Sequence, residues 1–500
     1  MRLRKIAGLV LSAMMAAGGL CAVAARAERP APFGRTARSR SADTPKTSGQ
    51  RPAEPELPAL PADSFIIRTS TRTLSQVVKR GQSVSSLAWH YLPESIFMRH
   101  ADFVEAIEKA NELNGKTLKP GQTVLIPGIP DKPFHDQPVT VPRDFDARTI
   151  YLTGWTAGSD HGLELIERWK AAGGNAVVFD IKDFDGEIRI PYDHKYSTSV
   201  GITIHNLPKY IHWLHGLHMH VIARIAVFRD ASMAQAYPQF DVRSRKTGKP
   251  WLENGKLAWV DPSLPDVQQF NLDLARQVAD DGADEIQFDY VRFPAEGDQP
   301  DAKFAYQSQH PEWLRSKVIT DFVARAYSEL HPKGVLVSLD VFGVMAWARK
   351  VDLERTGQNI AELAHHSDVI SPMIYPSHFF HFDGYTDPGD APEHFIGESM
   401  RRFQQVTQGS GVVLRPWLQA FAWRTKSYSL AYVLTEIRVA AAEGGVGFLF
   451  WNADNSYPKP LVAMTEIQAD GGKIPSTPML HDQSGPVVKP ALARASSHKG

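Results

Sequence analysis

Residues 285–294 read Glu-Ile-Gln-Phe-Asp-Tyr-Val-Arg-Phe-Pro, and this stretch decides the fold. Its aromatic and β-branched residues predict a strand that is buried on both faces. Gln287 and Asp289 share one face of that strand, where burial alone would favour Val or Leu. A helical pattern over 266–280 precedes the strand, and Pro294 ends it. We therefore expect Asp289 near the carboxyl end of a parallel strand, where barrels and open sheets carry their chemistry.

Asp289 also has a purely structural explanation. A buried carboxylate is often the ion-pair partner of a nearby cation, and Arg292 lies three residues further along the chain. Asp289 could also cap a neighbouring loop, which would be a second structural role. The residue alone does not separate these roles, so the interpretation depends on what the other strands carry.

Strands alternate with helices along most of the chain. The eight predicted strands are 149–155, 176–183, 220–228, 285–293, 335–343, 369–377, 414–421 and 446–453. Amphipathic segments lie between them, at 161–172, 266–280, 311–330, 359–366, 392–408 and 429–443. This alternation predicts an α/β fold, a (β/α)8 TIM-type barrel over 148–470 whose first and last strands pair. A doubly wound open sheet is the alternative, but no Gly-rich phosphate turn follows the first strand.

Polar residues recur in the last halves of the predicted strands. A structural barrel would fill these positions with Val, Ile and Leu, so their convergence predicts a polar substrate at the barrel mouth. Individually, Arg224 could simply neutralise an aspartate, and Ser338 could bond a local backbone group. The candidates are Asp180 and Lys182, which share a face, then Arg224, Asp289, Ser338, Asp340, Tyr375, Trp417, Gln419, Trp451 and Asn452.

Two long insertions, 229–265 and 295–310, follow the third and fourth strands on the same face of the barrel. The segment after the sixth strand contains His378 and His381 near several carboxylates. These histidines lack the spacing and the partners of a zinc site, so we expect no metal and no cofactor.

The overall composition excludes some classes of protein. The chain has 500 residues, which predicts roughly two to four domains. Lys and Arg together equal Asp and Glu in number, and a nucleic-acid-binding protein would show a basic excess. We therefore expect no nucleic-acid partner. The eleven Trp suit either a large core or stacking on sugar rings.

The first 27 residues have the pattern of a secretory signal peptide. Basic residues are followed by an apolar centre over 6–23 and by Ala25-Arg26-Ala27. We therefore expect an exported protein of the periplasm, cell envelope or extracellular space, with no transmembrane helix in the mature chain. Cys21, the only cysteine, would be removed with the leader. A lipid anchor at Cys21 is the alternative, but Leu20 fits poorly where a lipobox needs a small residue.

Residues 28–63 and 474–500 are rich in polar and small residues and contain few large apolar ones. Such segments bury too little surface to offset the entropy of ordering, so we interpret them as a linker and a tail. Between linker and barrel, residues 64–130 form a small unit. Strand and turn patterns over 77–84 and 118–127 enclose helical patterns over 85–91 and 102–111, in the order βααβ.

This small unit resembles the LysM domain. The similarity lies in Val-Lys-x-Gly-x-Ser over 78–83, in Asn111, and in Leu-x-Pro-Gly-Gln-x-Val-x-Ile-Pro over 118–127. The stretch between Tyr91 and Asp102 is longer than the pattern expects. The resemblance implies binding to glycans that contain N-acetylglucosamine, such as peptidoglycan or chitin. A generic structural domain is the alternative.

The barrel segment also resembles a known family. Five motifs carry the likeness: Phe-Asp-Ile-Lys-Asp at 179–183, Ala-Arg-Ile-Ala-Val-Phe at 223–228, Phe-Asp-Tyr-Val-Arg-Phe-Pro at 288–294, Leu-Asp-Val-Phe-Gly at 339–343 and Pro-Met-Ile-Tyr-Pro at 372–376. They resemble a bacterial family catalogued as a domain of unknown function and assigned to glycoside hydrolysis by a distant likeness to retaining α-glycosidase barrels. That likeness implies a nucleophilic carboxylate at Asp289. The acid/base residue it implies comes from the fifth or sixth strand, which leaves Asp340.

Two carboxyl groups at a barrel mouth suit glycosidic cleavage, in which one attacks or stabilises the sugar and the other protonates the leaving oxygen. Neighbouring strands lie about 4.8 Å apart, so Asp289 and Asp340 suit the ~5–5.5 Å of a retaining site. Asp180 with Asp289 would suit the wider inverting arrangement. Lys182, Arg224 and Arg292 would keep one carboxylate ionised, while Tyr375, Trp417 and Trp451 would stack on sugars.

The expected function is thus an exported, cell-wall-associated glycoside hydrolase acting on a polysaccharide. The alternatives are a non-catalytic glycan-binding or scaffold barrel, and a barrel enzyme of another class such as a deacetylase or lyase.

Overall fold

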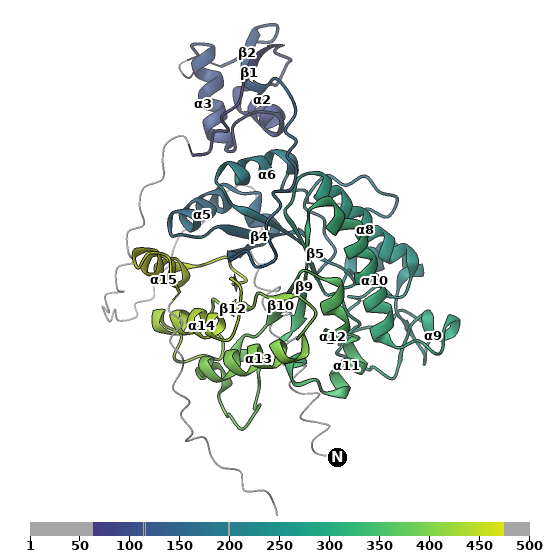
Figure 1. Ribbon diagram of the computed structural model, residues 1–500. Helices are drawn as coiled ribbons and strands as arrows, with labels where there is room; N and C mark the ends of the chain where they lie inside the picture. Colours follow the sequence, from purple (N-terminus) through teal and green to yellow (C-terminus); the bar gives the residue numbers. More distant parts are fainter. Residues whose placement is uncertain (1–63, 114, 116, 199–200, 475–500) are drawn as a thin grey trace, which may run out of the picture.

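The computed structural model describes residues 64–113, 115, 117–198 and 201–474, and it contains a small domain and a large barrel (Figure 1). The predicted leader at 1–27, the predicted linker at 28–63 and the predicted tail from residue 475 on lie outside the described residues. Within the described part of the chain, no helix is both long and apolar enough to cross a membrane.

The small domain is a two-stranded antiparallel sheet covered by two helices. Its elements are β1 (Thr71–Val77), α2 (Val84–Tyr91), the 3-10 helix η1 (Leu92–Glu94), α3 (His100–Ala110) and β2 (Thr123–Pro130). The order βααβ was predicted, but the first strand ends at Val77 instead of beginning there. Residues 78–83 turn the chain, and Ser83 caps α2 through a capping box with Ser86. The Asn111 side chain joins α3 to β2, since it bonds both the N–H and the C=O of Leu125.

The large domain is a closed barrel of eight parallel strand positions, as the sequence predicts. Around the barrel the strands are β3 (Arg148–Leu152), β4 (Ala176–Lys182), β5 (His220–Ala226), β7 (Glu285–Asp289), β9 (Leu336–Phe342), β10 (Val369–Met373), β11 (Val413–Leu414) with β12 (Trp417–Gln419), and β13 (Phe448–Trp451). β11 and β12 are two pieces of the seventh strand position. Two pairings close the ring, β9 with β10 and β13 with β3, and the second confirms the predicted contact of first and last strands.

Helices cover the outside of the barrel (Figure 1). The helices of this domain, including the short ones in the loops at the mouth, are α4 (Gly154–Ala157), α5 (Asp160–Ala171), α6 (Leu207–Gly216), α7 (Ala231–Ala236), α8 (Pro265–Asp280), α9 (Tyr306–Gln309), α10 (Arg315–Leu330), α11 (Lys350–Thr356), α12 (Ile360–Leu363), α13 (Pro392–Val406), α14 (Leu430–Ala442) and α15 (Pro458–Ala469). The sequence interpretation did not include α6 and α15. The two insertions join each other, because β6 (Arg243–Ser244) pairs with β8 (Ala302–Lys303).

Two strands end earlier than the apolar pattern predicts, and both ends reach the barrel mouth. β7 stops at Asp289 because Tyr290 has a φ of 50°, in the left-handed region that breaks strand pairing. β3 stops at Leu152, and Thr153 then caps the short helix α4. Trp155 is therefore on a helix at the mouth and not on the first strand.

At the end of the barrel opposite the mouth, a buried cluster of charged residues links β5, β7 and the segment between β11 and β12. Glu285 begins β7, and one of its carboxylate oxygens accepts a hydrogen bond of 2.8 Å from Arg415, between β11 and β12. His220 Nε2 lies 3.1 Å from the same oxygen. Burial alone would raise the pKa of Glu285, but the charge of Arg415 and the hydrogen bond from His220 outweigh it and bring the pKa to about 2. The cluster crosses the barrel interior and serves stability.

The small domain rests on α6 of the barrel. The Lys209 ammonium, which is 5% exposed, donates to the carbonyl oxygens of Leu92 and Phe97, each at 2.6 Å. Asn206 donates to the Pro93 carbonyl at 2.8 Å, and the Trp213 indole donates to the Ser64 carbonyl at 3.1 Å. Burial lowers the pKa of Lys209 to about 7. The two domains are thus joined by a packed interface in addition to the connecting chain.

Replacing Arg415 with Met should lower the free energy of unfolding by about 3–5 kcal/mol, because Glu285 would be left buried without its cation. Urea denaturation at pH 7 measures this change. Arg438→Met, on the exposed side of α14, is the matched control and should shift the value by no more than about 0.5 kcal/mol. Equal urea midpoints for the two variants would contradict the stabilising role of the cluster.

Candidate active site

Four neighbouring strands carry charged residues in their carboxyl-terminal halves. These residues are Asp180 in β4, Arg224 in β5, Asp289 in β7 and Asp340 in β9. The parallel register places Asp180 directly beside Arg224, and Asp289 two positions above Gln287, the neighbour of Arg224 on the other side. Side chains two residues apart share a face of a strand, so these groups converge inside the barrel mouth as predicted.

Arg224 is the centre of the arrangement. Its two terminal nitrogens donate to Asp180 and to Asp289, and its Nε lies 3.4 Å from Asp340 Oδ2. A guanidinium presents donors in a fixed plane, so one side chain can bind several carboxylates at once. We call Asp180, Arg224, Asp289 and Asp340 the carboxylate cluster. It contains three acidic groups and one cation.

Each carboxyl of the carboxylate cluster has one further donor. The Tyr151 hydroxyl donates to Asp180 at 2.5 Å, the Trp417 indole donates to Asp340 at 2.6 Å, and the backbone N–H of Tyr290 donates to Asp289 at 2.5 Å. Tyr151 was not among the sequence candidates. The signal was available, since Tyr151 and Thr149 stand two residues apart on the first strand and so share its inner face.

The three carboxyl groups differ in exposure, and burial raises the pKa of two of them. Burial, and then the charge of Asp289, raises the pKa of Asp340 well above its ordinary value, despite the opposing charge of Arg224. Burial also raises the pKa of Asp180. The side chain of Asp289 is 9% exposed, against 2% for Asp180 and 1% for Asp340. Asp289 is thus the most exposed of the three carboxyl groups, and Asp340 lies beside it on the neighbouring strand with a raised pKa.

Aromatic rings form one wall beside the carboxylate cluster. Trp417 packs edge-on to Tyr151 at 6.1 Å between ring centres, and Tyr375 lies 5.8 Å from Trp451. Trp451 is only partly buried, and its ring also stacks near Tyr151 at 6.5 Å. The structure therefore brings the three aromatic candidates, Tyr375, Trp417 and Trp451, together at the mouth.

Lys182 does not join the carboxylate cluster, and the prediction that it shares a face with Asp180 is wrong. The pairing of β4 with β5 shifts register between the two residues, and this bulge turns Lys182 to the outer face. Its ammonium lies 2.7 Å from Asp230 and donates to Asn271 of α8 at 2.9 Å. With 0% exposure it cannot contact a substrate in this structure.

The other polar candidates hold the loops of the mouth. Gln419 accepts from the Ser377 N–H at 3.2 Å and donates to the Phe421 carbonyl at 2.8 Å. Asn452 donates to the Ala420 carbonyl at 2.6 Å. Arg292 donates to the Phe293 carbonyl at 3.0 Å, and its guanidinium lies over the rings of Trp259, Tyr290 and Phe342. Gln419, Asn452 and Arg292 are all buried, so they hold the loops around the site in place.

The two histidines considered as metal ligands, His378 and His381, are not part of the carboxylate cluster. His378 is buried, and this burial lowers its pKa to about 3, so the ring is neutral beside Ser377. His381 has a φ of 46° and follows a tight loop. Among the described residues, no group of three or more His, Cys, Asp or Glu side chains has a metal-binding arrangement.

Family models match both domains. A model described as "Putative glycosyl hydrolase domain" matches residues 149–457, and the LysM domain model matches residues 77–127. No curated protein matches the chain.

Several solved structures are similar to it. A hypothetical protein from Ruminiclostridium thermocellum ATCC 27405 shares 32% identity over 38% of this chain and 97% of its own, with a TM-score of 0.33. The PgaB (BpsB) glycoside hydrolase domain from Bordetella bronchiseptica shares 14% identity over 65% of this chain and 97% of its own, with a TM-score of 0.44. A β-N-acetylhexosaminidase from Bacteroides fragilis NCTC 9343 shares 12% identity over 74% of this chain and 73% of its own, with a TM-score of 0.42.

Asp340→Asn should remove one protonated-carboxyl C=O band from the infrared spectrum, because burial raises the pKa of Asp340 and so favours the protonated form. Glu436→Gln is the control: Glu436 is buried in α14, its pKa is also raised well above the ordinary value, and its variant should lose a separate band. Loss of a carboxylate band in Asp340→Asn, with every acid band retained, would show that Asp340 is ionised.

Proposed function

The chain belongs to the family whose model describes a glycosyl hydrolase domain, and from this premise we propose that its barrel cleaves glycosidic bonds of a polysaccharide with Asp289 and Asp340. The observation that carries the proposal is the carboxylate cluster itself. It sets Asp289, the more exposed carboxyl, beside the fully buried Asp340, whose pKa is raised. A pair of carboxyl groups with different proton affinities is what acid-assisted glycoside cleavage needs.

In the proposed reaction, an Asp289 oxygen attacks the anomeric carbon as the bond from that carbon to the leaving oxygen breaks. The leaving oxygen takes the proton from Asp340. Water then loses a proton to Asp340 and releases the sugar from Asp289, which restores both groups. β7 and β9 are neighbours, which supports the ~5–5.5 Å separation of a retaining pair.

Arg224 has two roles in this proposal. Its contact with Asp289 fixes the direction in which that carboxyl points. Its contact with Asp340 is the longest of its three ion pairs, so it is the one that we expect substrate to displace when Asp340 delivers its proton. Asp180, bound by Arg224 and Tyr151, would hold the guanidinium in place. Tyr375, Trp417 and Trp451 would contact the sugar rings.

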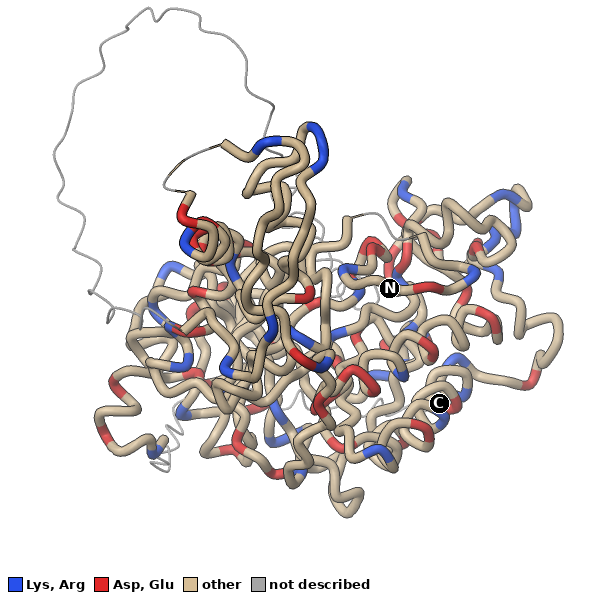
Figure 2. The backbone as a smooth tube through the Cα atoms, turned by 90° about the horizontal axis from the view of Figure 1, so that it is seen from above, with Lys and Arg blue, Asp and Glu red and all other residues tan. Residues whose placement is uncertain are grey.

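The small domain bears on where the protein acts. A LysM domain suggests glycan binding, and we propose peptidoglycan or a chitin-like polymer as its ligand. We also propose that the predicted leader exports the chain to the periplasm or cell envelope, where that ligand lies. Basic and acidic positions are interspersed along the described chain (Figure 2), which does not favour a nucleic-acid partner.

One observation favours the alternative of a non-catalytic glycan-binding barrel. All three carboxyl groups of the carboxylate cluster are paired with Arg224, so none is an unpaired anion before substrate arrives. The two functions differ in a measurable way, since only the hydrolase releases new reducing ends.

Asp289→Asn should lower kcat by several orders of magnitude, because the amide cannot form the glycosyl ester. Asp340→Asn should lower kcat by about 10²–10⁴-fold on natural glycans and far less on aryl glycosides, whose leaving groups need little protonation. Reducing ends released from peptidoglycan, chitin and α-linked polymers provide the measurement. Asp144→Asn, exposed on the connector before the barrel, is the control.

Unchanged turnover by Asp289→Asn would contradict the proposed nucleophile. A leaving-group effect in Asp180→Asn instead of Asp340→Asn would assign the acid to Asp180 and favour inversion.

The fragment 64–130 should sediment with insoluble peptidoglycan, because it contains the whole LysM match. Its buried side chains, among them Phe103 and Ile107, form a separate hydrophobic cluster that supports folding of the fragment by itself. Sodium dodecyl sulfate gels of pellet and supernatant at several salt concentrations provide the measurement, with the heat-unfolded fragment as control. A fragment that stays in the supernatant at every salt concentration would rule out the anchoring role.

A further inference from the structure

Trp155 is a large apolar side chain that the fold leaves uncovered at the barrel mouth. Its exposure is 58%, and Trp89 of the small domain is the other exposed tryptophan in the described chain. Trp155 belongs to α4, which directly follows β3. A Cβ atom on the preceding Gly154 would lie 2.7 Å from the backbone oxygen of Asp180. The segment that contains Trp155 therefore packs against β4, the strand that contributes Asp180 to the carboxylate cluster.

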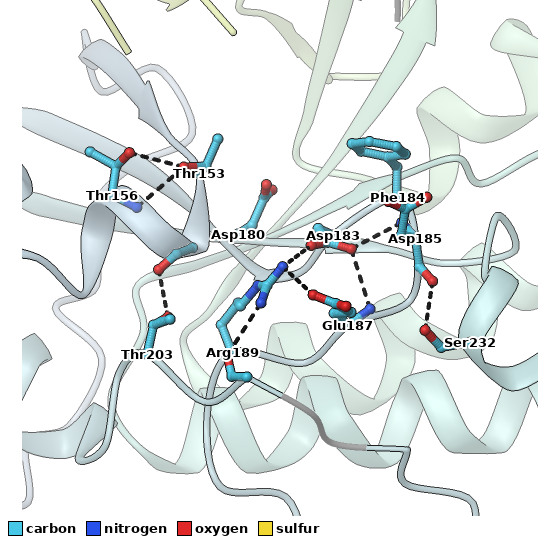
Figure 3. Close-up of polar contacts among 12 residues, drawn as sticks. Thr153, Thr156, Asp180, Asp183, Phe184, Asp185, Glu187, Arg189, Thr203 and Ser232 are labelled. Atoms are coloured by element: carbon cyan, nitrogen blue, oxygen red, sulfur yellow. Dashed lines mark hydrogen bonds and ion pairs between the residues drawn. The ribbon is translucent and has the colours of Figure 1, made fainter. Parts of the chain in front are cut away.

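One face of the Trp155 ring is supported by Arg189. The guanidinium carbon lies 4.6 Å from the ring centre, in cation–π contact. Arg189 is itself 2% exposed and is bound by Asp183 at 2.5 Å, by Glu187 at 2.7 Å and by the Gly201 carbonyl at 3.2 Å. Figure 3 shows the Arg189 guanidinium facing both carboxylates, on the side of β4 away from the Asp180 carboxyl. Because one ring face is occupied, the exposed area belongs largely to the other.

The helix that carries the ring is held tightly. Thr153 caps it and bonds the Asn455 side chain at 3.0 and 3.1 Å, and Thr203 donates to the Gly154 carbonyl at 2.6 Å. A Cβ on Gly158 would come within 2.4 Å of the Thr203 carbonyl oxygen, so α4 cannot shift inward to bury the ring. The exposed face is thus maintained by the fold, although its burial would stabilise the protein.

The surroundings indicate what kind of ligand the ring would accept. Glu187 is partly exposed, and its carboxylate and that of Asp183 lie on the same guanidinium that supports the ring. Carboxylates accept hydrogen bonds from sugar hydroxyls, while the C–H face of a pyranose packs on an aromatic ring. Two carboxylates on one guanidinium leave a net negative charge, which disfavours an anionic sugar.

We propose that Trp155 is the stacking platform of a sugar subsite on the Asp180 side of the barrel mouth, taking an uncharged hexose or N-acetylhexosamine unit of the polymer. The proposal rests on the proposed glycan substrate but not on its cleavage. It extends the aromatic wall of Tyr375, Trp417 and Trp451 by one position around the mouth, because β3, which precedes Trp155, lies between β13 with Trp451 and β4 with Asp180.

Fluorine NMR of the full chain labelled with 5-fluorotryptophan tests this subsite without turnover, in an Asp289→Asn background. Trp155→Phe identifies the Trp155 signal by its loss, and Trp89→Phe identifies a signal that reports on the small domain. The probes are hexasaccharides of chitin and of cellulose and a muramic-acid-containing peptidoglycan fragment. The Trp155 signal should shift on addition of at least one uncharged hexasaccharide. No shift at millimolar concentrations of either one, or a shift with the anionic fragment alone, overturns the proposal.

Binding constants give the second readout. Trp155→Ala should weaken binding of the hexasaccharide by about 3- to 12-fold, with Trp155→Phe in between, because stacking energy scales with the ring. Leu314→Ala removes another exposed apolar side chain, away from the mouth, and should leave binding unchanged. Equal affinity of Trp155→Ala and Leu314→Ala also overturns the subsite. Weakened binding in a chain that releases no reducing ends would leave the subsite standing and remove the proposed hydrolysis.

Discussion

One guanidinium, that of Arg224, determines how the barrel mouth is built. It binds three carboxyl groups from three other strands, so each strand must deliver its aspartate at a matching height. A charge buried to this degree is tolerated only when its partners are in place, which fixes the register of β4, β5, β7 and β9 together. The same burial raises the pKa values of Asp180 and Asp340 despite the charge of Arg224, because one cation does not fully offset the desolvation of both carboxyl groups. The structural requirement and the proposed chemistry thus have one cause.

The small domain adds a second constraint, which concerns where a bound glycan would lie. Its segment between α2 and α3, the stretch that is longer than the LysM pattern expects, provides the carbonyl groups that bind Lys209 and Asn206. The extra residues thus serve as a docking element on α6. A domain fixed in this way presents its glycan at a set orientation to the barrel, whereas a freely tethered domain would only raise the local concentration of substrate.

The sequence predicted the fold well because the fold depends on periodic patterns. Eight apolar stretches separated by amphipathic segments specify a parallel barrel, and the polar residues at their ends placed Asp180, Arg224, Asp289 and Asp340 at one site. The errors came from local backbone geometry. The bulge after Asp180 turned Lys182 outward, and the left-handed Tyr290 ended β7 at Asp289. Neither follows from residue type, since both are set by contacts between strands. Trp155 was missed because the apolar pattern placed it on the first strand, whereas the spacing of Thr149 and Tyr151 could have identified Tyr151.

The most direct test of the account is intact-protein mass spectrometry of Asp340→Asn during turnover of an activated aryl glycoside. Without its general base the variant should accumulate a glycosyl-enzyme, and peptide mapping should place the added sugar on the peptide that contains Asp289. An adduct on another carboxylate, or turnover with no adduct and with inversion at the anomeric carbon, would contradict the central claim that Asp289 is the nucleophile of a retaining pair.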